Sequence, residues 1–422
     1  MSVEKTEVLV VGAGQAGVAI SEHLGLAGIA HLVLERGRIA ERWRSSRWDS
    51  LVANGPAWHD RFPGMALPGS PDGFVPKESV ADYFEAYAKQ VGAPIRCGVE
   101  VLRVERRPGH AGFQVETSHG VVHANRVVVA TGAFQVPLMP SLVPESAGLM
   151  QIHSADYRNP AQLPEGAVLV VGAGSSGVQI ADELVRAGRK VYLSVGPHDR
   201  PPRSYRGRDF VWWLGVLNKW DAEATPGKEH TTIAVSGAYG GHTVDFRQLA
   251  ARGIVLLGRT DGCEGGTMRF ADDLATNIER GDANYLSVLD EADAFLMRNG
   301  ISLPEEPEAR RFLSMPACVT DPVRSLDLER AGIAAIVWAT GYTADYSWLP
   351  ADALGDDGRP RHQRGVSSEA GVYFLGLPWQ TRRGSSFIWG VWYDAKYVAE
   401  HIVKQRNYRD YLPSVASQVQ NV

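Results

Sequence analysis

Two segments of the chain share a spacing of glycines that is suited to binding phosphate. Residues 7–17 read EVLVVGAGQAG, and residues 167–177 read AVLVVGAGSSG. In both, an apolar run typical of a buried strand precedes Gly-x-Gly-x-x-Gly and a segment compatible with a helix. Glycines at these places permit the turn, the close approach of a pyrophosphate, and the packing of helix on strand. We therefore predict two dinucleotide-binding loops, made of Gly12, Gly14, Gln15, Ala16 and Gly17 and of Gly172, Gly174, Ser175, Ser176 and Gly177.

The strand that follows each loop ends in a different kind of residue. The first ends at Glu35, 23 residues after the first glycine of its loop, and Arg36 follows. A carboxylate at this place bonds a ribose hydroxyl, so the first site suits FAD or NAD. The second strand ends at Ser194, with Arg200 and Arg203 shortly after it. Because arginine holds a 2′-phosphate and a carboxylate repels it, we predict NADPH at the second site; a solvated basic loop is the alternative.

The chain is too long for one ordinary hydrophobic core, and the repeated loop divides it. Its 422 residues favour two domains. We predict an α/β fold with two Rossmann-like dinucleotide-binding domains, in which the NADPH-binding domain is inserted into the FAD-binding domain. Residues 1–150 and 333–422 are assigned to the FAD-binding domain and its C-terminal tail, and residues 151–332 to the NADPH-binding domain.

Two further strands end in the same tripeptide, Ala-Thr-Gly, at 130–132 and 339–341. Each is a continuous apolar run, as expected of a buried parallel strand. We assign Thr131, Gly132, Thr340 and Gly341 to cofactor contacts. Proline-rich stretches at 137–144 and 160–164 are expected to be hinges between the domains. Residues 221–330 predict no particular function, and the segment after Arg406 is expected to be a surface extension.

The composition excludes several classes of protein. A formal net charge of −5 argues against a nucleic-acid partner. The three cysteines, Cys97, Cys263 and Cys318, form no Cys-x-x-Cys pair, so neither a dithiol centre nor a metal site is expected. No signal peptide and no apolar run long enough to cross a bilayer is recognised. We expect a cytoplasmic protein without a membrane partner, as a monomer or a homo-oligomer.

The order of these motifs resembles that of the flavin-containing monooxygenases, including the plant YUCCA type. Trp43, Arg44 and Trp48 resemble the segment that contacts the flavin in that family. Asn54 matches the position of the family's active-site asparagine, which implies a contact near the reactive C4a atom of the flavin. The segment with Gly390 and Asp394, which is also assigned to cofactor binding, resembles the family's C-terminal flavin-binding turn and helix.

Part of the family's fingerprint between the domains is missing. The pattern is Phe-x-Gly-x-x-x-His-x-x-x-Phe/Tyr, and His153 and Tyr157 fit its second half. Ala147 and Leu149 stand where the phenylalanine and the glycine are expected. A tryptophan in place of Tyr157 would indicate a Baeyer–Villiger monooxygenase, so that activity is the second choice.

The resemblance implies an activity. NADPH would reduce FAD, and O2 would then form a C4a-hydroperoxyflavin that passes one oxygen to a nucleophilic N, S or C centre of a small organic molecule. The amide of Asn54 both donates and accepts hydrogen bonds, which suits contact with a peroxide or a flavin carbonyl, although an asparagine before Gly-Pro also forms turns. The substrate pocket is expected to be lined by His59, Trp379, Phe387, Trp389 and Trp392, for which core packing is the alternative.

Two rival functions use the same loops. An FAD-dependent NAD(P)H oxidoreductase would reduce a quinone or another acceptor without forming an oxygenated product. A nucleotide-binding sensor or transport regulator would bind the dinucleotides without turnover, since fold alone does not fix function.

Overall fold

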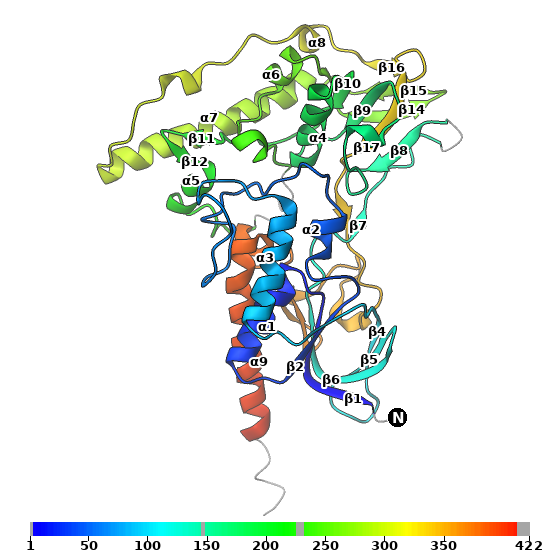
Figure 1. The fold of residues 1–422 in the computed structure, drawn as a ribbon, viewed down its shortest axis with the longest axis vertical. Coiled ribbons are helices and arrows are strands. Elements are labelled where there is room, and N and C mark those ends of the chain that lie inside the picture. The colour runs from blue at the N-terminus through cyan, green and yellow to red at the C-terminus, as the bar shows by residue number, and fades with distance from the viewer. Residues whose placement is uncertain (1–2, 145–147, 225–231, 412–422) are drawn as a thin grey trace, which may run out of the picture.

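The computed structural model describes residues 3–144, 148–224 and 232–411, which form two domains around two separate sheets (Figure 1). In each sheet, the strand that leads into a glycine loop lies between parallel neighbours. The predicted α/β fold with two Rossmann-like domains is therefore confirmed. Ala147 of the incomplete fingerprint lies outside the described residues, as does the C-terminal segment from residue 412.

The first domain is built on β1 (Glu4–Val11), whose side chains alternate between two cores. Val8 and Val10 pack under helices, whereas Leu9 and Val11 pack on the opposite face of the sheet. The other strands are β2 (His31–Glu35), β3 (Ile95–Cys97), β4 (Val101–Arg106), β5 (Phe113–Thr117), β6 (Gly120–Val129), β19 (His362–Gln363), β20 (Val366–Ser367) and β21 (Val372–Phe374). The helices are α1 (Gln15–Leu26), α2 (Glu41–Ser45), α3 (Lys77–Gln90) and α9 (Ile388–Tyr411). The sheet order is β19-β20-β21-β6-β1-β2-β3, with β4 and β5 attached beside β6.

The second domain repeats this arrangement around β9 (Ala167–Val171). Val168 and Val170 face one core, and Leu169 and Val171 face the other. Its sheet has the order β13-β10-β9-β17-β8, made of β8 (Met150–His153), β10 (Val191–Ser194), β13 (Val255–Leu257) and β17 (Ile333–Trp338). Its helices are α4 (Ser175–Arg186), α5 (Phe210–Val216), α6 (Phe246–Ala251), α7 (Leu274–Asn299) and α8 (Ala317–Thr320). Short strands add β11 (Ser204–Tyr205), β12 (Arg208–Asp209), β14 (Thr260–Glu264), β15 (Thr267–Phe270) and β16 (Ser325–Asp327).

The chain crosses between the domains twice, and the two crossings lie side by side. β7 (Val136–Pro137) pairs antiparallel with β18 (Tyr342–Thr343). The predicted return to the first domain at residue 333 is wrong, because β17 pairs with β9 and β8 in the second sheet. The predicted hinge at 160–164 is also wrong, since it lies within the second domain, where Arg189 donates to the carbonyls of this stretch.

The fingerprint histidine joins this two-stranded linker to the second sheet. His153 is fully buried; its Nε2 donates to the Gly341 carbonyl at 2.9 Å, and its Nδ1 accepts from the Ala155 N–H at 3.1 Å. Both ring nitrogens are therefore used by a neutral imidazole. Burial lowers the pKa of His153. Tyr157, the other fingerprint residue, donates its hydroxyl to Glu183 at 2.7 Å, so both residues hold the fold together.

Acid should loosen this linker. Because the folded-state pKa of His153 lies below the ordinary value of 6.5, its contribution to stability is complete above that value and is lost as the pH falls below it. We expect the Tm to fall between pH ~7 and pH ~5, and to fall less steeply in His153→Gln, which keeps an N–H donor and does not titrate. Circular dichroism melts at each pH measure the slopes. The exposed His119→Gln is the control, and equal slopes in all three proteins would contradict the prediction.

Candidate functional site

The first glycine loop has the geometry of a pyrophosphate cradle. Gly12 has a φ of +101°, and a Cβ there would lie 2.7 Å from the Ala130 carbonyl oxygen. A Cβ on Gly17 would lie 1.9 Å from the Gly12 carbonyl oxygen. A Cβ on Gly14 would meet no atom within 4 Å, so the backbone there is open to a ligand. Because α1 begins directly after Gly14, its first N–H groups reach the same space, and the loop fits the phosphates of a dinucleotide.

Glu35 lies beside this loop at the end of β2. Its carboxylate accepts the N–H groups of Ala13 and Gly37 at 2.8 Å each. This places an acid next to the cradle, where the sequence predicts a ribose contact. The Arg36 side chain is 62% exposed, and its Nη1 lies 3.7 Å from Glu100. An exposed side chain can turn toward a ligand, so the cofactor contact predicted for Arg36 remains a prediction.

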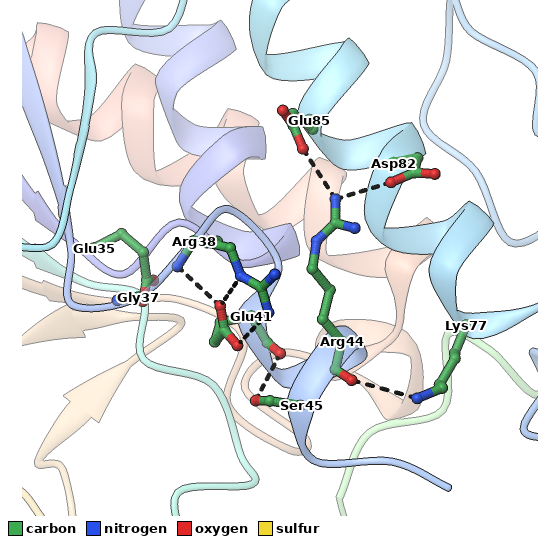
Figure 2. A network of polar contacts seen from close by, with 9 residues as sticks. All are labelled: Glu35, Gly37, Arg38, Glu41, Arg44, Ser45, Lys77, Asp82 and Glu85. Atoms are coloured by element: carbon green, nitrogen blue, oxygen red, sulfur yellow. Dashed lines mark hydrogen bonds and ion pairs between the residues drawn. The ribbon is translucent and has the colours of Figure 1, made fainter. Parts of the chain in front are cut away.

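The flavin contact predicted for Arg44 is wrong. Figure 2 shows its guanidinium turned toward α3, where it donates to Asp82 and Glu85 at 2.9 Å each. Only its carbonyl faces inward, where it accepts from Lys77. Arg44 therefore fastens α2 to α3 and does not reach the loop.

The two tryptophans near Arg44 contribute to packing between the domains. Trp48 is 4% exposed and belongs to the core of the second domain, together with Leu51. Trp43 packs against the cores of both domains. Burial among second-domain side chains replaces the flavin contact predicted for Trp48, while the contact of Trp43 remains a prediction.

The two Ala-Thr-Gly segments each close on the glycine loop of their own domain. Ala130 lies against Gly12, and the following Thr131 and Gly132 both accept from Gln135 Nε2, at 2.9 and 3.0 Å. These residues lie beside the first cradle, where they were predicted.

Thr340 and Gly341 do not act in the same way. The Thr340 hydroxyl donates to the Leu138 carbonyl, and the Gly341 carbonyl accepts from the Leu138 N–H at 3.0 Å and from His153. These two groups hold the linker, and the cofactor contact predicted for Thr340 and Gly341 remains a prediction.

The second glycine loop repeats the geometry of the first but is partly covered. A Cβ on Gly172 would lie 2.4 Å from the Ala339 carbonyl oxygen. A Cβ on Gly177 would lie 1.8 Å from the Gly172 carbonyl oxygen. A Cβ on Gly174 would lie 3.2 Å from Thr232, and Ser175 donates its hydroxyl to the Ile233 carbonyl at 2.8 Å. A pyrophosphate against Gly174 therefore requires Thr232 to shift. Ser176 is half-buried beside the same loop.

Arg200 is not free to bind a phosphate. It is 1% exposed, and it donates to Asp282 Oδ1 through Nε at 3.0 Å and through Nη2 at 2.5 Å. Arg247 binds the other oxygen of Asp282 at 2.5 Å. Burial acts to raise the pKa of Asp282, but the hydrogen bonds from Arg247 and Arg200 lower it overall. The predicted 2′-phosphate contact of Arg200 is wrong, because its charge is neutralised inside the second domain.

Arg203 binds the first domain instead of a cofactor. It is 5% exposed, and Nη1 donates to the Asn54 carbonyl at 2.6 Å while Nη2 donates to Asp209 at 2.6 Å. Its predicted phosphate contact is therefore also wrong. From α4, Gln179 Nε2 donates to Asn54 Oδ1 at 2.9 Å and to the Val235 carbonyl at 2.9 Å.

Asn54 consequently lies where the two domains meet. Its carbonyl and Oδ1 accept from the second domain, whereas its Nδ2 makes no hydrogen bond within the described part of the chain. An amide fixed at its oxygen can present two N–H donors to a ligand. This arrangement suits the role that was predicted for Asn54 from the sequence.

The structure places a different arginine at the end of β10. Ser194 is buried, and its hydroxyl donates to the Gly258 carbonyl at 3.0 Å and accepts from Thr260. The predicted cofactor contact of the Ser194 side chain is wrong, since its hydroxyl joins β10 to the turn after β13. Arg259 in that turn is exposed, and its Cγ lies 3.8 Å from where a Gly196 Cβ would be. Sequence reasoning missed Arg259 because it is distant in sequence from Ser194 and reaches it only through strand pairing.

The C-terminal segment closes on the first cradle. Gln15 Nε2 donates to the Ser386 carbonyl at 2.7 Å, and Ala16 is buried against Gly376. A Cβ on Gly390 would lie 1.9 Å from the Gly384 carbonyl oxygen, so glycine is required for this approach.

Asp394 lies one turn further along α9. It is 4% exposed; Oδ1 accepts from Thr381 at 2.7 Å, and Oδ2 is buried without a partner among the described residues. A buried carboxylate oxygen without a partner needs a donor. A hydroxyl group of a flavin cofactor bound at the adjacent glycine loop would supply this donor. Asp394 therefore fits the cofactor role that was predicted for it.

Three of the five residues predicted to line the substrate pocket come together. The rings of His59, Phe387 and Trp389 meet around Trp220 of the second domain, with centroid separations of 5.1, 5.2 and 6.0 Å from Trp220. The sequence analysis missed Trp220, whose one signal is the run of tryptophans at 212, 213 and 220.

Trp392 does not join this group. It donates Nε1 to Glu22 at 2.7 Å and packs edge-on against His23 of α1, so its predicted pocket role is wrong. Trp379 is half-buried with a φ of +54°, a backbone region that a tryptophan adopts only under constraint. Its pocket role remains a prediction.

The described residues contain no group of histidine, cysteine and acidic side chains arranged to hold a metal. Within residues 3–144, 148–224 and 232–411, no helix is long and apolar enough to cross a bilayer.

Comparison with known proteins agrees with this geometry. Residues 9–206, which contain both loops, match the family described as pyridine nucleotide-disulphide oxidoreductase. A CzcO-like oxidoreductase of Geobacillus kaustophilus (strain HTA426) is 35% identical over 402 residues, 94% of this chain and 98% of the relative. The probable indole-3-pyruvate monooxygenase YUCCA4 of Arabidopsis thaliana is 25% identical over 94% of this chain and 90% of its own. A flavin-containing monooxygenase from Stenotrophomonas maltophilia has the same fold, with a TM-score of 0.66 and 19% identity over 96% of this chain and 100% of the other.

Removing Arg200 should affect stability rather than cofactor choice. Arg200→Met leaves part of the Asp282 charge buried and unpaired, so we expect a loss of about 3–5 kcal/mol in the free energy of unfolding. The ratio of the KM values for NADPH and NADH should not change. Urea unfolding and steady-state kinetics measure the two quantities, and the surface variant Arg103→Met is the control. A stable Arg200→Met protein with a KM raised for NADPH alone would overturn this assignment.

Proposed function

Because the chain belongs to the family of CzcO-like oxidoreductases and flavin-containing monooxygenases, we propose that it is an FAD- and NADPH-dependent monooxygenase. Its substrate is a small organic molecule with a nucleophilic nitrogen, sulfur or carbon centre. The observation that carries the proposal is the position of Asn54, fixed at its oxygen by Gln179 and open at its Nδ2, where the two domains with their glycine loops meet.

The residues present fit FAD at the first cradle. The backbone around Gly14 would bind the pyrophosphate, Glu35 would hold the ribose, and Asp394 Oδ2 would accept from a ribityl hydroxyl. Bound FAD supplies hydride acceptance and the reaction with O2. The chain positions the groups around it: Asn54 donates from Nδ2, and Gln179 holds that amide in place from the second domain.

Arg259 supports NADPH as the reductant. The 2′-phosphate of NADPH lies beyond the end of the second strand of a Rossmann domain, which here is β10. Ser194 brings no negative charge to this position, and the exposed Arg259 lies directly beside it. A guanidinium there attracts a phosphate dianion and gains nothing from a ribose hydroxyl.

The reaction is tested with isotopic oxygen. Purified protein with FAD, NADPH and 18O2 is supplied in turn with trimethylamine, methyl p-tolyl sulfide, pyruvate, cyclohexanone and benzoquinone. A monooxygenase of the proposed kind should incorporate one 18O atom into the amine or the sulfide, whose heteroatoms are nucleophiles, as mass spectrometry of the products shows. Because a carbonyl carbon is an electrophile, labelled acetate from pyruvate or labelled lactone from cyclohexanone, without a labelled N- or S-oxide, would indicate oxygenation at a carbonyl, as in a Baeyer–Villiger monooxygenase. Reduction of benzoquinone without any labelled product would replace the proposal with an acceptor reductase.

Asn54→Asp separates cofactor reduction from oxygenation. The substitution keeps the shape and removes both Nδ2 donors, so we expect the oxygenated product formed per NADPH to fall about 10- to 100-fold, with hydrogen peroxide replacing it. The exposed Asn125→Asp is the matched control. If Asn54→Asp retains the wild-type product yield, the role assigned to Asn54 is wrong.

Arg259→Gln should show whether this arginine makes the second site prefer NADPH over NADH. Losing one charge-assisted hydrogen bond should raise the KM for NADPH about tenfold and leave the KM for NADH unchanged. Steady-state NAD(P)H oxidation measures both, with the exposed Arg269→Gln as the control. An equal rise for both cofactors would show that Arg259 does not contact the 2′-phosphate.

A further inference from the structure

One carboxylate fixes His59 relative to Asn54. Asp60 accepts the His59 Nδ1–H at 2.9 Å through one oxygen and the Gly55 N–H at 3.1 Å through the other. A Cβ on Gly55 would lie 2.4 Å from Asp60 Oδ1, so glycine is required between Asn54 and this carboxylate. The imidazole is therefore held at a set position from the residue on which the proposed reaction depends.

His59 contacts two indole rings from distant parts of the chain, and the three ring centroids lie 5.1, 5.5 and 6.0 Å from one another. Its ring is stacked on Trp220 at 5.1 Å and 19° and on Trp389 at 5.5 Å and 25°. Trp220 follows α5 in the second domain, and Trp389 lies in the first turn of α9. We call His59, Trp220, Phe387 and Trp389 the His59 cluster. Arg382 lies over the Trp389 ring at 5.5 Å and is held by Asp221 at 2.8 Å, which fixes one side of the cluster.

The second ring nitrogen of His59 has no partner. The side chain is 6% exposed, and Nε2 is buried without a hydrogen bond to any described residue. A carboxylate only accepts, so the Nδ1 that faces Asp60 carries the proton and Nε2 presents a lone pair to the cluster. A buried acceptor without a donor costs stability, and such a group in a native structure points to a ligand that satisfies it.

Two aromatic rings at the cluster reach the surface. Phe387 is 46% exposed and meets Trp220 edge-on at 5.2 Å, and Trp58, which contacts His59, is 37% exposed. These two rings are therefore the ones past which a ligand would approach the cluster. Trp220 and Trp389 are tilted at 44° to each other, so their indoles form two inclined ring surfaces beside His59.

We propose that the His59 cluster is the substrate-binding site and that it takes a planar aromatic molecule carrying an O–H or N–H group. The stacked rings present faces to an aromatic ligand, and Nε2 accepts a hydrogen bond from its donor group. Asp60 is a positioning residue, since it acts through His59. The proposal rests on the proposed function for the reaction that follows binding, but binding itself needs neither NADPH nor O2.

The experiment compares two ligands of nearly the same shape. 2-Naphthol carries an O–H donor, and 2-fluoronaphthalene does not. Equilibrium dialysis of the oxidised, FAD-loaded protein should show one saturable site that binds 2-naphthol about fivefold more tightly, as one hydrogen bond implies. His59→Phe, which keeps a ring and removes Nε2, should abolish this preference and leave 2-fluoronaphthalene binding unchanged. The exposed His119→Phe is the control.

Trp389→Leu tests the indole ring surfaces separately. It should weaken the binding of both ligands severalfold and leave their ratio unchanged. Equal binding of the two ligands to the wild type, a preference that persists in His59→Phe, or no effect of Trp389→Leu would each overturn the proposal. Because no turnover is measured, these results are independent of the isotopic oxygen test.

Discussion

Two hydrogen bonds join Asn54 to the second domain, one from Gln179 and one from Arg203, and the geometry of the candidate site depends on them. Among the residues that the structure describes, the linker between the domains contains two short strands, β7 and β18. Contacts at the domain interface must therefore decide how the two glycine loops face one another. Gln179 also binds the Val235 carbonyl, and the same stretch covers the second loop at Thr232. Movement of that segment is thus coupled physically to the side chain of Asn54.

Two arginines of the second domain are paired with a buried carboxylate of the same domain. Arg200 and Arg247 share the carboxylate of Asp282, and all three side chains are buried or nearly so. Burying such a network costs free energy, because each charged group loses its hydration and must be stabilised by hydrogen bonds to its partners. Arg259, in the turn beside β10, is exposed and lies outside this network. The run of arginines in the sequence therefore includes Arg200, whose charge is neutralised inside the protein.

The aromatic side chains near the C-terminus divide in the same way. Trp392 holds α9 against α1 through Glu22 and His23, whereas Trp389, one turn earlier, faces His59 and Trp220. Because an α-helix has 3.6 residues per turn, two side chains three residues apart do not point in the same direction. The split therefore follows from how α9 is docked by Gly390 and Gly384.

The sequence by itself determined the two cradles, since glycine is required where a Cβ would strike a neighbouring carbonyl, and local spacing fixes that requirement. It also determined the fold class, and it named Asn54, Asp394 and His59 as candidates for the site. Only the tertiary structure decided that Arg200 is buried while Arg259 lies beside the end of β10, that β17 belongs to the second sheet, and that Trp220 completes the aromatic cluster. The physical reason is the same in each case: pairing partners, burial and charge neutralisation are set by residues that are distant in the chain, and neither spacing nor residue type records them.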